Sequence, residues 1–220
     1  MTRPGGTALN AGQVGAFRAS EFIAARYREQ TVDDGVFRQI AEKELAVLET
    51  LCKIPAKRDW KQERAVLQHR MSEAGAFIRS QEKVTAALEG AYKQSAALLA
   101  DGLGGLTPRD FAETLRNRQL LTAQIFYLES ILMQIDHIGS RGGSIVLAKE
   151  GVPIHPKLGE VWRMAAENKS YRNQVMQCGY GANGYPEISW EPCRPVPETD
   201  GWFENVWNDF RNGTIYGGRK

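Results

Sequence analysis

The sequence predicts a mainly α-helical protein: a three-helix antiparallel bundle, preceded by a separate helix and followed by an irregular tail with a small β-hairpin. Up to about residue 138, apolar residues recur at helical spacing, and glycine and proline mark the breaks between these runs. Beyond that point the periodicity fades, and glycine, proline and aromatic residues become more frequent. A hydrophobic content of 42% is ordinary for a globular protein, so a core of useful size can form.

The first helices are delimited by residues that start and stop them. Residues 1–8 are interpreted as a loop, and a first helix follows over 9–29, with Thr7 or Asn10 as its cap. A second helix is predicted over 33–51, because two aspartates suit its N-terminus and a proline follows its end.

Two longer helices complete the predicted bundle. The third covers 61–100, with a break allowed near Gly75, and a glycine-rich turn separates it from the fourth. The fourth runs from Pro108 to about Ile138, since Thr107 is a suitable cap in front of a first-turn proline. Antiparallel packing of the second, third and fourth helices would bury their apolar faces.

The tail is predicted to hold a hairpin and a last short helix. Residues 174–180 and 187–194 can pair across a turn at 181–184. The helix at 202–211 is interpreted as an amphipathic anchor that docks the tail, whereas an exposed version of it would mark a partner surface.

Composition argues against several classes of function. The net charge of +2 argues against a role with nucleic acid or anionic membranes, and no apolar run is long enough for a membrane span. Cys52, Cys178 and Cys193 are too scattered for a disulfide framework, a zinc site or an iron–sulfur cluster held by this chain alone. They predict a cytoplasmic protein. Cys178 and Cys193 could face each other across the hairpin, and two buried thiols are favoured over a disulfide in a reducing compartment. The three histidines are isolated, so no metal site is predicted.

A short N-terminal motif carries most of the functional information. The segment Arg3-Pro4-Gly5-Gly6-Thr7-Ala8-Leu9-Asn10 resembles the Arg-x-Gly-Gly-x-x-Leu segment of the fumarate reductase and succinate dehydrogenase flavoproteins. In that family the segment lies late in the FAD-binding domain, and the helix after it points its N-terminus at the flavin. Paired glycines let backbone approach a flat ring, and free N–H groups at a helix start can donate to a flavin oxygen.

Three further segments match this family, and they do so in the family's order. Residues 70–79 resemble a helical stretch that ends in a hydrophobic–Arg pair. Residues 113–121 resemble its Leu-x-x-x-Asn-Leu helix, with Gln119 in place of the usual asparagine, and residues 140–142 match its Ser-Arg-Gly turn.

The resemblance implies FAD as the cofactor and assigns roles to residues near the N-terminus. Arg3 lies where the family keeps an arginine that contacts the substrate carboxylate, so it is the catalytic candidate. Flavin contacts are expected, chiefly through backbone groups, from Gly5, Gly6, Thr7, Ala8, Leu9 and Asn10. The implied domains are the C-terminal end of an FAD-binding domain (1–30), a helical flavoprotein C-terminal domain (31–142) and the tail (143–220).

Basic residues further along the chain receive structural interpretations. Arg141 could approach the active site or cap the carbonyl groups at the end of the fourth helix, and the cap is favoured. Arg116 and Arg118 are expected to lie near glutamates, in solvated or inter-helix positions.

Two parts of such a flavoprotein have no counterpart in the sequence. One is the Gly-x-Gly-x-x-Gly motif that binds the ADP half of FAD, and the other is the capping domain. The chain is therefore expected to be the C-terminal portion of an FAD-dependent oxidoreductase, inactive alone and without tight FAD binding. Its partners would be a small-molecule substrate and an N-terminal FAD-binding domain, on the same longer chain or on a separate subunit. The alternatives are a non-enzymatic helical interaction module and a separately encoded subunit of a split flavoenzyme.

Overall fold

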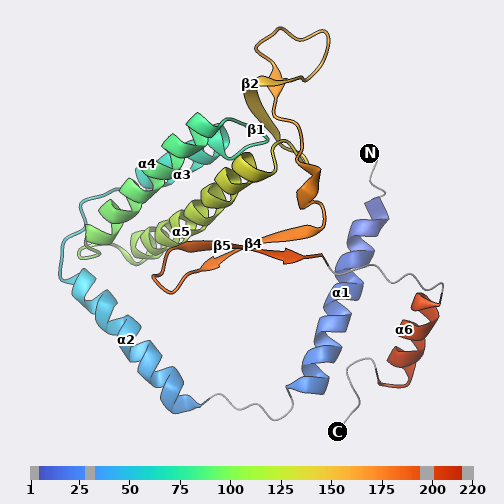
Figure 1. The fold of residues 1–220 in the computed structure, drawn as a ribbon. Helices are drawn as coiled ribbons and strands as arrows, with labels where there is room; N and C mark the ends of the chain where they lie inside the picture. The colour runs from blue at the N-terminus through green and yellow to red at the C-terminus, as the bar shows by residue number, and fades with distance from the viewer. Residues whose placement is uncertain (1–4, 28–32, 194–200, 215–220) are drawn as a thin grey trace. The chain divides into compact units, whose positions relative to one another are not determined.

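Helices dominate the computed structural model, which describes residues 5–27, 33–193 and 201–214 (Figure 1). Its contacts divide the chain into two units: Lys43–Cys193 forms one, and Met1–Glu42 with Arg194–Lys220 forms the other. The predicted class, mainly helical with a small hairpin, is confirmed.

A three-helix bundle forms the core of the larger unit. Its helices are α3 (Trp60–Ala74), α4 (Gln81–Ala100) and α5 (Pro108–His137), which run up, down and up (Figure 1). The buried apolar residues that meet between them are Leu67, Ala74, Val84, Ala87, Leu88, Ala91, Leu98, Leu121, Ile125, Leu128 and Ile131. At about 1.5–3 kcal/mol for each fully buried large side chain, this cluster is a major source of stability.

The helices that form the bundle are not the three that were predicted. Helix α2 (Asp34–Cys52) has the predicted limits, but none of its residues is buried. Instead, the predicted third helix is broken in two, and its halves supply α3 and α4. The break follows Gly75, whose N–H donates to the Met71 carbonyl at 2.9 Å and closes the last turn of α3.

Side-chain caps fix where the three bundle helices begin. Asp59 accepts a hydrogen bond from the N–H of Lys61 at the start of α3, and Ser80 does the same for Lys83 at the start of α4. Thr107 caps α5, as predicted, with its hydroxyl oxygen 3.2 Å from the N–H of Asp110. These caps satisfy backbone donors that a helix start leaves unpaired.

The glycine-rich turn between α4 and α5 packs against the connection from α2 to α3. Leu103 donates to the Leu51 carbonyl and Gly104 to the Ile54 carbonyl, at 2.9 and 2.8 Å. A Cβ atom on Gly102 would stand 1.9 Å from the Ile54 oxygen, so this approach requires glycine. The Asp101 carboxylate completes the junction by accepting from backbone N–H groups of residues 57 and 58.

A small sheet, absent from the prediction, follows the bundle. Strand β1 (Ile78–Arg79) pairs in parallel with β2 (Ile145–Pro153), and β2 pairs antiparallel with β3 (Arg163–Met164). A 3-10 turn at Lys169–Tyr171 leads into the tail. The residues just after the bundle are therefore more regular than the irregular tail that was predicted.

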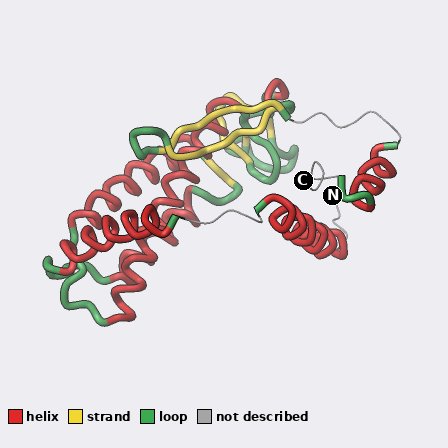
Figure 2. Tube along the Cα trace, turned by 90° about the horizontal axis from the view of Figure 1, so that it is seen from below, coloured by secondary structure: helices red, strands yellow, loops and turns green. Residues whose placement is uncertain are grey.

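The predicted hairpin is present and packs on α5. Its strands, β4 (Gln174–Tyr180) and β5 (Pro186–Pro192), are antiparallel in continuous register (Figure 2). The Tyr180 ring meets Phe126 of α5 edge to face, with centroids 4.6 Å apart. Aromatic contact of this kind anchors a two-stranded ribbon that would be marginal on its own.

The smaller unit contains two complete helices among the described residues. Helix α1 spans Gly5–Arg26, and α6 spans Trp202–Arg211, the predicted limits of the last helix. Helix α1 begins four residues earlier than predicted, because the paired glycines lie inside its first turn and not in a preceding loop.

Candidate functional site

The sequence-predicted site centres on the first turn of α1. Arg3 lies outside the described residues, whereas Gly5, Gly6, Thr7 and Ala8 form that first turn, and only their backbone is described. Leu9 and Asn10 follow in the helix and are both exposed, Leu9 by 67%. The helix therefore brings the six predicted flavin-contact residues together in its first two turns.

This turn has the chemistry that a flavin ring requires. The first N–H groups of an α-helix have no partner within the helix, and the helix dipole favours negative charge there. Two glycines at the start present backbone without side chains, and the first turn contains no acidic residue that would repel an anion. The residues present thus fit a planar, electron-rich acceptor at this helix end.

The Ser-Arg-Gly turn at the end of α5 is built differently from the prediction. Arg141 does not cap the helix: it donates to the Tyr171 carbonyl at 3.2 Å, and its Nε lies 3.6 Å from the Glu167 carboxylate. The helix end is covered by Asn168, whose side chain donates to the His137 carbonyl and whose N–H donates to Ile138. Because Asn168 occupies the last carbonyl groups, the Arg141 guanidinium points to the segment after β3 instead.

Arg116 and Arg118 have different environments although they are two residues apart. Arg116 forms the expected pair with a glutamate, its Nη1 lying 3.2 Å from Glu113, and is mostly exposed. Arg118 turns inward and donates to the Asp101 carbonyl at 3.1 Å, and burial lowers its pKa. The prediction of a glutamate partner is therefore confirmed for Arg116 and wrong for Arg118.

Three arginines along one side of the bundle contact three amide side chains of α5. Arg64 donates to Asn117, Arg70 to Gln124, and Arg79 to Gln134. We call these three contacts the arginine–amide ladder. Burial lowers the pKa of both Arg70 and Arg79. Neutral amides have no charge to titrate, so these contacts hold helix α5 beside α3 and β1 at any moderate pH.

The ladder was not predicted, although the sequence contains a signal for it. Asn117, Gln124 and Gln134 are polar residues that lie among the apolar positions of α5, and the first two are buried. A buried amide must find a hydrogen-bond partner, so their positions call for donors on the neighbouring helix. Identifying those donors requires knowing which elements pack beside α5, and the composition of the bundle was predicted incorrectly.

The cysteines and histidines do not form a reactive cluster. Cys178 stands opposite Ile188 in the hairpin, and Cys193 lies beyond its end, so the predicted facing of the two thiols is wrong. Cys193 is also exposed. Across residues 5–27, 33–193 and 201–214, no three His, Cys, Asp or Glu side chains gather as metal ligands would.

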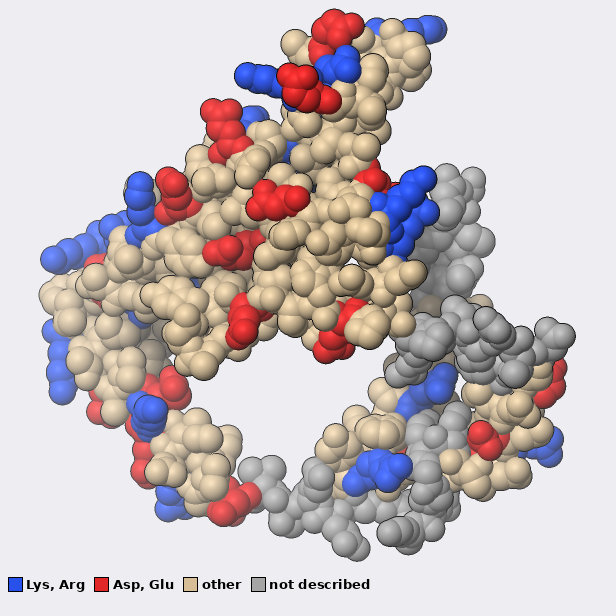
Figure 3. All heavy atoms as spheres, viewed as in Figure 1, with Lys and Arg blue, Asp and Glu red and all other residues tan. Residues whose placement is uncertain are grey.

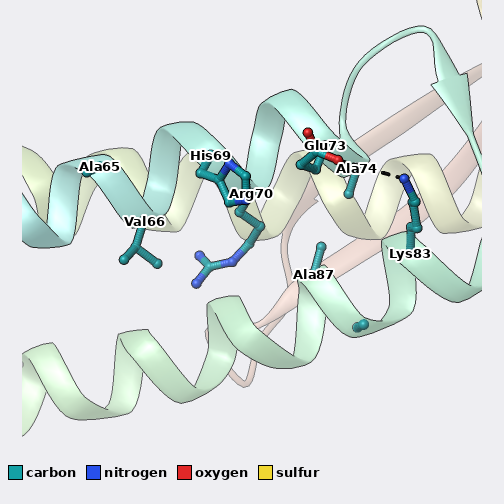
Figure 4. A pocket seen from close by; sticks show the side chains of 9 residues that line it. Ala65, Val66, His69, Arg70, Glu73, Ala74, Lys83 and Ala87 are labelled. Atoms are coloured by element: carbon teal, nitrogen blue, oxygen red, sulfur yellow. Dashed lines mark ion pairs between the residues drawn. The ribbon is translucent and has the colours of Figure 1, made fainter.

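A groove lies between α3 and α4 in the bundle unit (Figure 4). It has a volume of about 630 Å³, and four alanines, Val66 and the aliphatic part of Arg70 form the apolar part of its lining. Glu73 and Lys83 form an ion pair of 3.8 Å at one end. The Arg70 guanidinium is already occupied by Gln94 and Gln124, whereas His69, which also lines the groove, is a side chain of the acid–base type.

Surface charge and helix hydropathy add two further observations. On the face drawn in Figure 3, acidic and basic side chains of the bundle unit are interspersed, which is unlike a nucleic-acid footprint. Among the helices in the described part of the chain, none is both long and apolar enough to cross a membrane.

Comparison with known proteins adds a similarity of fold. No protein-family model matches the sequence, and a search of curated proteins finds no match. A solved structure, the E245Q mutant of FrdA from Escherichia coli quinol fumarate reductase, superposes with a TM-score of 0.60 at 12% sequence identity. The match covers 79% of this chain but only 28% of FrdA. The chain thus shares the fold of a part of FrdA and spans less than a third of its length.

Proposed function

We propose that this chain is the C-terminal portion of an FAD-dependent oxidoreductase of the fumarate reductase/succinate dehydrogenase flavoprotein type. The observation that carries the proposal is the fold shared with part of FrdA over 79% of the chain. The four sequence segments that resemble the family, in its order, support it independently of the fold. The remaining 72% of FrdA has no counterpart here, which is why the proposal includes an FAD-binding domain as partner.

In this proposal the first turn of α1 contacts the flavin ring. The N–H groups of residues 5–8 would donate to the pyrimidine oxygen of the ring and would favour negative charge on it. Bound FAD would supply the centre that exchanges a hydride with the substrate. The protein's part is to hold the ring and to favour one of its charge states.

Arg3 is proposed to bind the substrate carboxylate, two residues before the helix begins. A guanidinium can hold a carboxylate through two parallel hydrogen bonds, which orients the substrate as well as attracting it. The bundle α3–α5 is proposed as a buttress that supports the flavin domain through its rigid, buried core.

The cofactor role is tested by flavin content. In the complete flavoenzyme, Gly6→Val should lower the flavin bound per protein, because a branched side chain would separate the helix start from the ring. Gly159→Val is the matched control, since a side chain there meets only open space. Unchanged flavin content in Gly6→Val would contradict the proposed contact between the first turn of α1 and the flavin ring. The isolated 220-residue chain is expected to purify colourless, and a bound flavin would contradict the need for a partner domain.

The catalytic role is tested by Arg3→Ala and Arg3→Lys in the same complete enzyme. Loss of a bidentate contact that strengthens in the transition state should lower kcat/KM by about 100-fold or more for alanine. Lysine should restore little, because it lacks the planar fork. Arg116→Ala, an exposed arginine on α5, should leave turnover unchanged. Normal turnover in Arg3→Ala would exclude this role, and a complete protein that binds no flavin would favour the non-enzymatic module.

A further inference from the structure

Helix α1 has two faces of different chemistry. Gly12, Gly15 and Ala19 lie close together on one face, and a side chain added at either glycine would meet open space. The opposite face is polar, with Asn10, Gln13, Ser20 and Glu21 lying one or two turns from Phe17. Phe17 is the aromatic ring of this mainly polar face, one turn after the exposed Val14, and it is 53% exposed.

Helix α6 offers the complementary surface. Among its described side chains, the apolar Val206 and Trp207 lie four and three positions before Phe210, and the three therefore fall on one face. Glu204, Asn205, Asn208 and Asp209 occupy the other face and are exposed. Phe210 lies at the centre of the apolar face and stacks on Trp207, with centroids 5.7 Å apart.

The two helices meet at these centres. The rings of Phe17 and Phe210 contact each other edge to face, with centroids 5.9 Å apart and planes at 60°. This is the favourable geometry for an aromatic pair. Both helices also belong to the same unit, although more than 170 residues separate them in the sequence.

We infer that α6 is a docking helix, whose aromatic face binds the Phe17 face of α1 in the same chain. The occupant of the Phe17 face is therefore this chain's own C-terminal helix. We assign the opposite face of α1, which carries the two glycines, to contact with the FAD-binding domain. This assignment rests on the proposed function. Helix α1 would then be held on both sides.

The position of the contact along α1 matters for the cofactor. Phe17 is twelve residues from Gly5, which is about 18 Å along the helix axis. A helix docked at Phe17 therefore fixes α1 without covering the first turn, where the flavin is proposed to lie.

The test is hydrogen–deuterium exchange on the full chain, with reciprocal variants. Phe17→Ala should speed exchange in residues 204–211 by about two- to tenfold, the factor that one aromatic pair is worth. Phe210→Ala should speed exchange in residues 13–21 to a similar extent. Phe37→Ala is the matched control, because Phe37 of α2 is likewise an exposed helical phenylalanine, and it should change neither segment.

Each other outcome overturns the inference. Unchanged exchange in both reciprocal variants would mean that α6 does not dock on α1. Protection that rises with protein concentration would assign the contact to a second copy of the chain. Exchange in residues 121–131 of the buried core checks that every variant remains folded. No flavin enters the measurement, so failure here leaves the cofactor proposal standing, and failure of that proposal leaves this result intact.

Discussion

Helix α2 and bundle helix α3 differ in burial in the direction opposite to their apolar content. Helix α2 places Val36 and Ile40 on one face, yet these side chains are 51% and 58% exposed. Helix α3 has a less apolar sequence, with several charged residues, yet it buries Leu67 and Ala74 and contributes two arginines to the ladder. An apolar stripe shows that a helix has a face to bury, but not which partner covers it.

The bundle and α2 also differ in the burial and hydrogen bonding of their polar side chains. In the bundle, buried Asn117 and Gln124 each accept from an arginine and donate to a backbone carbonyl of α3. Both ends of each amide are therefore satisfied, as a low-dielectric interior requires. In α2 the polar side chains remain exposed, so removing them leaves no buried group without a partner.

The largest expected effect is on the core. Leu128→Ala, at a position with 0% exposure, should lower the free energy of unfolding by about 2–5 kcal/mol, whereas Leu45→Ala on α2, 56% exposed, should change it by less than about 0.5 kcal/mol. Urea denaturation of the full chain, followed by circular dichroism, measures both. Equal losses in the free energy of unfolding would show that the side chains of α2 are as well packed as those of the bundle, and would contradict the difference between the two regions.

A smaller effect is expected from the arginine–amide ladder. Asn117→Ala should cost about 1–3 kcal/mol, because the Nε–H of Arg64 loses its acceptor and the Trp60 carbonyl loses the amide donor 2.8 Å away. Gln119→Ala, exposed on the same helix, is the control and should be nearly neutral. If the two substitutions cost the same, water replaces the amide easily and the ladder adds little to stability.

The smallest effect should appear only at high pH. Burial, followed by a 2.8 Å hydrogen bond to Glu129, raises the pKa of Tyr92 from 10.0 to about 12. Because the folded-state value is the higher one, its contribution to stability is complete below pH 10 and is lost between pH 10 and 12. Tyr92→Phe should therefore show a shallower fall in urea midpoint over that range. Tyr127→Phe, whose side chain is exposed, should follow the unsubstituted protein; identical profiles for all three would discount the Tyr92–Glu129 contact.

Much of the secondary structure could be predicted because local signals decide it. Thr107-Pro108 marks the start of α5, and the alternating segments on either side of residues 181–184 form the hairpin. The limits of α6 were predicted correctly from its apolar spacing alone. The start of α1 was not, because Gly5 and Gly6 favour a loop by propensity and are helical here.

Features that depend on distant residues were not predictable in this way. Strands β1 and β3 have two residues each, which is too short for an alternating pattern, and they exist through pairing with β2. Arg141 near a helix end suggested a cap, but Asn168, 31 residues after the last residue of the helix, fills that position. Of the proposed site, the sequence located the first turn of α1, whereas Arg3 lies outside the described residues and its role stays a prediction.

The ladder also has a consequence for the order of folding. Its contacts join residues 53, 54 and 55 positions apart, and α4 lies between the partners in the chain. The arginine and the amide of each contact cannot meet until α4 has reversed the chain direction, so closure of this loop must come first. The three contacts should accordingly form late, after the folding transition state. Substitutions in them would then mainly speed unfolding and leave the folding rate almost unchanged, which makes the ladder a determinant of how long the native bundle persists.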